Sequence, residues 1–273
     1  MMKLISNCLE CFGEQISRLM IPEEDKRQLF LELFNFASKY KNLFKDTPVH
    51  LARLVYKNKV VIDFFRKAKP KEIEFSLKVA KDLSDKDLPL IEILKISTAL
   101  NVYDFSAPQF ENQWKEKIKE IEVKCDVENI NGKVLYILDN CSEIGVDILF
   151  LENLKKKKNV EITVMPRQQD FINDVTIDDL VKYDLNKKIE NFAEIIPLDI
   201  YESSKSKNVI KLSELPKFVE KFDFVVSKGQ ANYEILSEFK FEKPKIIYAL
   251  IAKCKVIADE IGIAHGKGII FQI

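Results

Sequence analysis

The chain has 273 residues, of which 47% are hydrophobic and 32% are charged, and its 43 basic and 43 acidic side chains leave no net charge. So large an apolar fraction excludes a disordered chain, and the length allows one large domain or two coupled domains. The neutral charge balance argues against a nucleic-acid binder, and no apolar stretch reaches the roughly 20 residues that cross a membrane, so we expect a cytoplasmic protein that contacts neither.

Helical patterns fill the first 120 residues. Residues 27–39 carry large apolar side chains at three- and four-residue spacing, which is typical of a helix with a broad apolar face. Thr47 followed by Pro48 is a favourable N-cap and first position for another helix. No segment before Gln113 has the alternation of a strand, so we predict an all-helical domain over residues 1–120. The predicted helices cover residues 27–39, 48–65, 71–83 and 90–100.

The pattern changes near Gly132, where strands and helices begin to alternate. Residues 133–140 form a short and nearly continuous apolar run, which is typical of a strand buried on both faces of a parallel sheet. A helical stretch follows over 143–156. We therefore predict the α/β class for residues 121–273, with a Rossmann-like, mainly parallel sheet flanked by helices. Further strands are predicted at 160–165, 194–198, 222–227 and 245–250, and further helices from Ile177, Ser213, Asn232 and Lys253.

Polar residues follow the predicted strands at the positions where such sheets bind ligands. In open α/β sheets the ligand lies beyond the carboxyl ends of the strands. Asp139 and Asn140 follow the first strand, and Asp174 follows the second. Their oxygens suit a hard divalent cation such as Mg²⁺ or Mn²⁺, whereas Lys228 and Lys253, which follow two later strands, suit a phosphate. The same residue types also form ordinary turns and caps, so the pattern alone leaves both interpretations open.

Several common nucleotide and hydrolase sites lack their signatures in this chain. No G-x-G-x-x-G follows the first strand, which argues against a dinucleotide site, and no Walker P-loop is present. The two histidines, His50 and His265, are a poor basis for a zinc site or a Ser-His-Asp triad. Cys141 stands where an aspartyl-nucleophile phosphatase would carry its second aspartate.

Four blocks of sequence stand out, LDNCSEIGVD (138–147), INDVTIDDL (172–180), FVVSKGQANYEIL (224–236) and IAKCKVIADEIG (251–262). Together they resemble the DUF89 family, also called damage-control phosphatases. Cys8-x-x-Cys11 and the segment 101–105 are similar to the archaeal and bacterial subfamily, so the resemblance spans nearly the whole chain. The chain departs from the family at Ser142, where relatives often carry glycine, and at Leu100, where a glycine commonly precedes the asparagine.

The resemblance implies a fold, an activity and a set of ligands. The implied fold is a helical N-terminal domain on a Rossmann-like α/β domain. The implied activity is that of a metal-dependent phosphatase acting on small phosphorylated metabolites, such as sugar phosphates or damaged metabolites. The family likeness further implies that Asp139, Asn140 and Asp174 hold the divalent metal, which in the family is Mg²⁺, Mn²⁺, Co²⁺ or Ni²⁺.

The chemistry of phosphate ester hydrolysis agrees with this assignment. Hydrolysis spreads charge over the phosphoryl oxygens, so catalysis consists mostly of positioning and electrostatic stabilisation. A metal would polarise a phosphoryl oxygen and lower the pKa of a bound water. Lys228 would neutralise the phosphate, and Gly229 would let the backbone approach it closely. Lys253 is a second phosphate candidate, although either lysine has an ordinary interpretation as a surface side chain.

Other polar residues near these positions have a structural interpretation beside the functional one. Asn232 either orients the site or caps the start of a helix. Glu143 either supports the site or favours the N-terminal dipole of its helix. Asn101 and Asp104 are candidate cleft residues from the helical domain, where they would select the substrate, or else helix-end caps.

Other functions stay open at this point. The same fold could be a binding or regulatory protein in which the metal only stabilises the loops. A methyltransferase is less favoured because the glycine-rich loop is absent. Cys8 and Cys11 have the spacing of half a zinc site or of a redox pair, and apolar packing explains them equally well.

Overall fold

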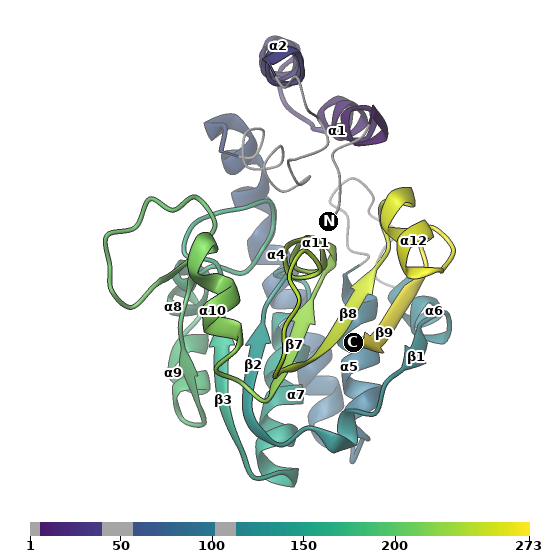
Figure 1. Ribbon diagram of the computed structural model, residues 1–273, viewed down its shortest axis with the longest axis vertical. Coiled ribbons are helices and arrows are strands. Elements are labelled where there is room, and N and C mark those ends of the chain that lie inside the picture. Colours follow the sequence, from purple (N-terminus) through teal and green to yellow (C-terminus); the bar gives the residue numbers. More distant parts are fainter. Residues whose placement is uncertain (1–5, 40–56, 102–112) are drawn as a thin grey trace.

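The structure is a computed structural model that describes residues 6–39, 57–101 and 113–273 (Figure 1). Its central sheet contains β1 (Glu122–Lys124), β2 (Gly132–Ile137), β3 (Val160–Met165), β4 (Ala193–Ile195), β7 (Phe224–Lys228), β8 (Lys245–Ile251) and β9 (Gly268–Gln272). The strand order is β1-β9-β8-β7-β2-β3-β4. All neighbours pair in parallel except β8 and β9, which are antiparallel. A second, two-stranded sheet pairs β5 (Leu198–Asp199) with β6 (Ile210–Lys211).

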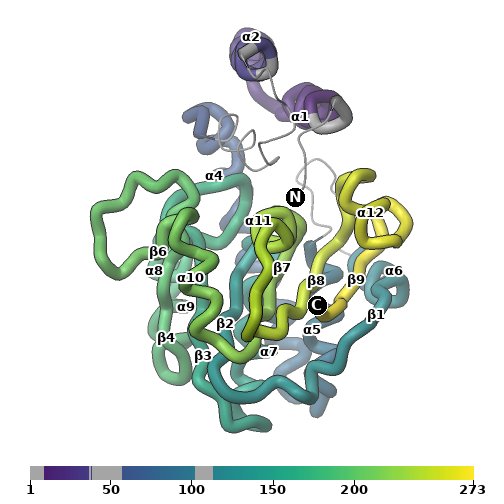
Figure 2. The backbone as a smooth tube through the Cα atoms, in the orientation of Figure 1, coloured from purple at the N-terminus to yellow at the C-terminus, as the bar shows by residue number. Residues whose placement is uncertain are grey.

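The α-helices cover both faces of the central sheet or, in the case of the first two, lie beyond one end of its strands (Figure 1). They are α1 (Ser6–Arg18), α2 (Glu23–Lys39), α4 (Lys59–Ser84), α5 (Leu90–Leu100), α6 (Gln113–Lys119), α7 (Ile144–Lys157), α8 (Ile177–Lys182), α9 (Leu185–Glu190), α10 (Leu215–Val219), α11 (Gln230–Leu236) and α12 (Lys255–Ile261). Leu135 and Ile137 of β2 share an apolar cluster with α10, α11 and α12, whereas Val134 and Tyr136 share another with α4, α5 and α7. Both views place α11 in front of the sheet and α5 behind it (Figures 1 and 2).

The predicted fold class is confirmed. A helical N-terminal region precedes a mostly parallel sheet flanked by helices. The predicted segments 90–100 and 160–165 coincide with α5 and β3. Thr176 begins α8 with a capping box, in which the side chains of Thr176 and Asp179 each accept a hydrogen bond from the other residue's backbone N–H. The division into two domains at residue 120 stays a prediction.

The α4 helix is longer than predicted. We expected separate helices over 48–65 and 71–83, but a single helix continues from Lys59 to Ser84 with Pro70 inside it. Proline removes one helical hydrogen bond and strains one turn. Here apolar residues are buried on both sides of the proline, and their packing against the rest of the protein keeps the helix continuous. The Thr47-Pro48 cap lies outside the described residues.

The edges of the sheet also differ from the prediction. The strand expected over 194–198 is two short strands in different sheets, β4 and β5, because Pro197 between them has no N–H to donate to a ladder. The three exposed residues of β1 were not predicted as a strand. Within the described ranges, no helix combines the length and the apolar character that a membrane span requires.

The sheet topology determines where a ligand would bind. β3, β2, β7 and β8 are successive neighbours and run parallel, so their carboxyl ends meet at one edge of the sheet. The residues that follow these four strands therefore come together there. Figure 1 shows α1 and α2 beyond this edge.

Candidate functional site

The loops after β2 and β3 are joined by backbone hydrogen bonds. Asn140 and Asp174 form an isolated antiparallel bridge, and the Val175 N–H donates to the Asp139 carbonyl over 2.7 Å. This pairing brings Asp139, Asn140 and Asp174 together from two separate segments of the chain. All three side chains are buried, so their charges lie in a region of low dielectric constant.

The charge of Asp174 affects the protonation of Asp139. Burial and, to a smaller extent, the charge of Asp174 raise the pKa of Asp139 to about 7, while Lys253 and Arg167 oppose the rise. The hydrogen bonds to these carboxylates use Oδ2 of each residue, and among the described residues the Oδ1 atoms have no hydrogen-bond partner. Two adjacent carboxylates and an amide oxygen form a donor set that suits a hard divalent cation.

The donor set differs from a cluster of three or more acidic, histidine or cysteine ligands. Within the described part of the chain, no group of three or more His, Cys, Asp or Glu side chains has an arrangement that would hold a metal. The set above is not such a group, because it contains two carboxylates and one amide. The remaining positions around a cation would belong to water or substrate.

Gly229 lies directly against Asp139. A Cβ atom at this position would be 1.9 Å from Oδ2 of Asp139, and the backbone φ of Gly229 is +77°. Both facts require glycine, since an L side chain rarely adopts this φ and would collide with the carboxylate. We predicted that glycine allows a close approach to phosphate, whereas in the structure the nearest group is the Asp139 carboxylate.

Arg167 is a charged residue of the site that the sequence analysis did not identify. It follows β3 after Pro166, and its Nε donates to Asp174 Oδ2 over 2.7 Å. Nη2 donates to Asn232 Oδ1 over 2.8 Å, and Asn232 in turn donates to the Leu138 carbonyl. Nη1 is buried without a hydrogen-bond partner among the described residues, and the guanidinium lies 5.9 Å from the centre of the Phe171 ring.

Asn101 connects the helical region to Asp139. It is the C-cap of α5, and its Nδ2 donates to Asp139 Oδ2 over 2.7 Å and also contacts Glu143. Asp104, the other residue predicted from this region, lies outside the described residues. The two departures from the resembling family meet here, because Ser142 Oγ donates to the Leu100 carbonyl over 2.9 Å.

Lys228 is fully buried, and its ammonium contacts acidic side chains. It donates to Asp147 over 3.0 Å and to Ser97 Oγ over 2.5 Å, and it forms an ion pair with Glu143. Burial lowers the pKa of Lys228, but Asp147 and Glu143 outweigh it, so the pKa is raised. All three ammonium protons are used within the protein, and the predicted contact with phosphate stays a prediction.

Lys253 differs from Lys228 in being exposed. It lies between β8 and α12, and its charge opposes the effect of burial, which raises the pKa of both Asp139 and Glu72. An exposed ammonium close to these carboxylates can pair with an anion that approaches from solvent.

The cysteine motif is only partly described. The thiols of Cys11, Cys125, Cys141 and Cys254 are free, and burial is the main cause that raises the pKa of Cys11. The side chain of Cys8 lies outside the described residues, so the metal, redox and packing interpretations of the Cys8-x-x-Cys11 motif stay predictions.

Comparison with known proteins places this geometry in context. A family model described as the damage-control phosphatase ARMT1-like domain matches residues 4–269. A damage-control phosphatase from Archaeoglobus fulgidus is 28% identical, and the alignment covers 97% of each chain. One from Pyrococcus horikoshii is 27% identical over 97% of this chain and 96% of the relative.

The fold is also similar to a solved structure. The crystal structure of a DUF89 family protein from Pyrococcus horikoshii matches with a TM-score of 0.79 and 23% identity, covering 100% of this chain and 99% of that one. At this identity the likeness supports the fold alone.

Proposed function

Since the chain belongs to the family defined by the damage-control phosphatase ARMT1-like domain, we propose that it is a metal-dependent phosphatase that hydrolyses small phosphorylated metabolites. One observation carries the proposal beyond family membership. The loops after β2 and β3 pair through Asn140 and Asp174. This pairing brings the buried carboxylates of Asp139 and Asp174 and the amide of Asn140 together at the carboxyl edge of the sheet, where α/β proteins bind ligands.

Asp139, Asn140 and Asp174 are the residues that would hold the cation, with Mg²⁺, Mn²⁺, Co²⁺ or Ni²⁺ as candidates. When bound, such a cation supplies Lewis-acid stabilisation of the charge on the phosphoryl oxygens. The protein contributes the positions of the donors. Asn101 orients Asp139 and Arg167 orients Asp174, each through a 2.7 Å hydrogen bond.

The basic residues have different roles in this proposal. Lys253 is exposed and would pair with the phosphate group of the substrate. Arg167 has a spare N–H beside Asp174, which suits it to add a donor where phosphoryl charge develops. Lys228 would act mainly through its ion pair with Glu143, which also contacts Asn101 and so fixes the groups around Asp139.

Hydrolysis of p-nitrophenyl phosphate by metal-stripped protein, with Mn²⁺, Co²⁺ or Ni²⁺ added back, tests the function. We expect product release only with metal, and a loss of more than about 100-fold in Asp174→Asn, since removal of groups that merely support a metal ligand already costs 10–100-fold. Asp178→Asn is the matched control, because Asp178 is an exposed acid four residues further along the same segment.

The outcomes separate the functional classes. Equal turnover by wild type, Asp139→Ala and Asp174→Asn would contradict the catalytic assignment. Metal binding by isothermal titration calorimetry without turnover of any compound in a panel of sugar phosphates and phosphorylated cofactor fragments would favour a binding protein. Turnover of one class in the panel would identify the substrate.

A further inference from the structure

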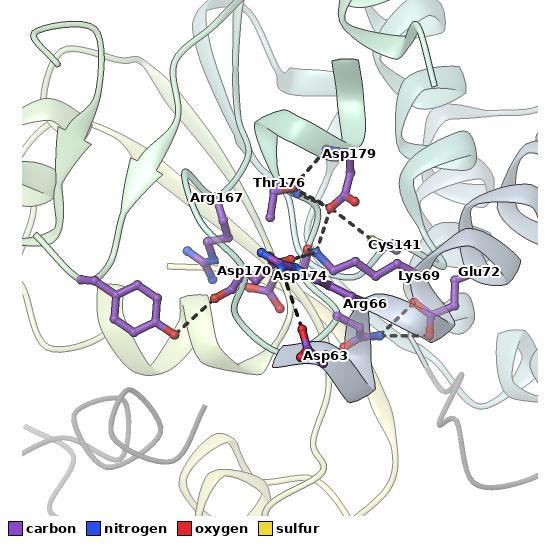
Figure 3. Close-up of polar contacts among 12 residues, drawn as sticks. Asp63, Arg66, Lys69, Glu72, Cys141, Arg167, Asp170, Asp174, Thr176 and Asp179 are labelled. Atoms are coloured by element: carbon purple, nitrogen blue, oxygen red, sulfur yellow. Dashed lines mark hydrogen bonds and ion pairs between the residues drawn. The ribbon is translucent and has the colours of Figure 1, made fainter. Parts of the chain in front are cut away.

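Lys69 lies on α4 and is one of the most deeply buried charged residues, with 2% of its surface exposed. Its ammonium donates to Asp170 Oδ1 over 2.9 Å, to Asp179 Oδ2 over 2.8 Å and to the main-chain carbonyl of Asp174 over 2.8 Å. These three oxygens all belong to residues 170–179, the loop before α8 together with the first turn of that helix, which we call the Asp174 loop. Figure 3 shows the Lys69 side chain reaching from α4 into this loop.

Two further residues of α4 hold the same loop. Arg66 donates from Nε to Asp170 Oδ2 over 2.7 Å, and Glu72 accepts from Asn173 Nδ2 over 3.1 Å. Because residues three apart lie on one face of a helix, positions 66, 69 and 72 present their side chains to the loop together. α4 thus contacts the loop at residues on both sides of Asp174.

The buried hydrogen bonds of Lys69 favour one conformation of the Asp174 loop. An ammonium buried away from water is costly unless each of its three protons has an acceptor, and here each one does. The acceptors can satisfy Lys69 only when the loop has one particular shape. Without the ammonium, the carboxylates of Asp170 and Asp179 and the Asp174 carbonyl would lose a shared partner, and the two negative charges would repel each other.

We propose that Lys69, assisted by Arg66 and Glu72, is a positioning residue that holds the Asp174 loop in the shape that presents Asp174 to the cation. The inference rests on the proposed function for the identity of the ligand, but the hold on the loop is a property of the protein alone. In this proposal Lys69 acts through the backbone of Asp174, whose bridge to Asn140 forms the other side of the donor set.

Two measurements on Lys69→Met test the inference. Hydrogen–deuterium exchange of the metal-free protein should be faster than wild type in peptides covering 167–179 and unchanged in β7. Calorimetric titration with Mn²⁺ should give a Kd raised by about 10–100-fold, the range found when supporting groups around metal ligands are removed. Lys67→Met is the matched control, because Lys67 is exposed on the same helix, and it should change neither quantity.

A second variant covers the case in which Lys69→Met does not fold. The side chain of Arg66 is 60% exposed, so Arg66→Met removes the ion pair with Asp170 without creating a cavity in the core. It should shift both measurements in the same direction by a smaller factor. Unchanged exchange and unchanged Mn²⁺ affinity in the folded variants would overturn the inference. If wild type takes up none of Mg²⁺, Mn²⁺, Co²⁺ and Ni²⁺, the proposed function fails, and the exchange of residues 167–179 still decides whether α4 holds the loop.

Discussion

The two sides of the candidate site are held in place by different kinds of interaction. On the first side, Asp139 lies two residues after β2 and Gly229 directly follows β7, so the strands fix their backbone positions, and the Asn101 hydrogen bond orients the Asp139 side chain. On the second side, Asp174 lies in a loop well beyond the end of β3 and is held by ion pairs and hydrogen bonds from Arg167 and Lys69. The difference indicates that changes of charge should damage the second side most, whereas steric and backbone changes should damage the first.

The largest effect on stability is expected from Arg167→Met. The change leaves the buried Asp174 carboxylate without its cation, and breaking a buried ion pair in this way costs about 3–5 kcal/mol. Urea unfolding of the metal-free protein measures the loss. Added Mn²⁺ should restore part of the stability in the variant, because a cation at the proposed site would again compensate Asp174.

The control for this variant is Arg18→Met on α1. Arg18 pairs with Glu14 on the surface, so its loss should cost less than about 1 kcal/mol. Equal losses in the two variants would show that the Arg167 pair is not the main support of the second side.

A smaller effect on the free energy of unfolding is expected from the protonation of Glu234 in α11. Burial raises the pKa of Glu234 from 4.5 to about 7. The folded state then keeps a proton that the unfolded state releases, so the stabilising contribution is complete below pH 4.5 and is lost as the pH rises to 7. Glu234→Gln removes this titration, and its stability relative to wild type should rise on the order of 3 kcal/mol across that window.

Urea unfolding at pH 4.5 and pH 8 measures this difference. Glu242→Gln serves as the control, because Glu242 is exposed, and its stability relative to wild type should not change with pH. A flat difference for Glu234→Gln would mean that the carboxyl group of Glu234 stays hydrated in the folded protein.

The same comparison explains what could be predicted from the sequence. The alternation of strands and helices indicated that Asp139 and Asn140 follow a strand, because this depends only on neighbouring residues. Lys69 was missed because its partners, Asp170, Asp174 and Asp179, are more than a hundred positions away, and no local pattern reports such a pair.

Lys228 also has partners that are distant in the sequence and could not be predicted, although its strand was predicted. Its place at the end of β7 followed from the apolar run, but the direction of its ammonium depends on Ser97, Glu143 and Asp147. These acceptors come from α5, α7 and the turn before α7. The continuity of α4 was missed for a related reason, because local propensity at Pro70 favours a break that long-range packing prevents.

Gly229→Ala probes the first side by steric means. The backbone conformation of Gly229, with φ +77° and ψ 163°, is nearly exclusive to glycine, and forcing another residue into such a region costs about 1–3 kcal/mol. The added methyl group also displaces the Asp139 carboxylate, so Mn²⁺ affinity and hydrolysis should fall together. Gly262→Ala is a matched control, because its φ is +72° but a Cβ there meets nothing within 4 Å. A similar loss of Mn²⁺ affinity in both variants would contradict the contact with Asp139.

The smallest effect is expected from Ser142→Ala, at the departure from the resembling family. Ser142 Oγ is buried and bonds the Leu100 carbonyl, so its removal should cost about 1 kcal/mol of unfolding free energy. Ser84→Ala removes an exposed hydroxyl with a comparable bond to the Lys81 carbonyl and should cost less than about 0.5 kcal/mol. Because Leu100 precedes Asn101, the bond also ties the end of α5 to the loop that carries Asp139. Ser142→Ala should therefore lower kcat slightly, while Ser84→Ala leaves kcat unchanged. If Ser142→Ala loses stability but keeps full activity, Ser142 contributes to packing and not to the position of Asp139.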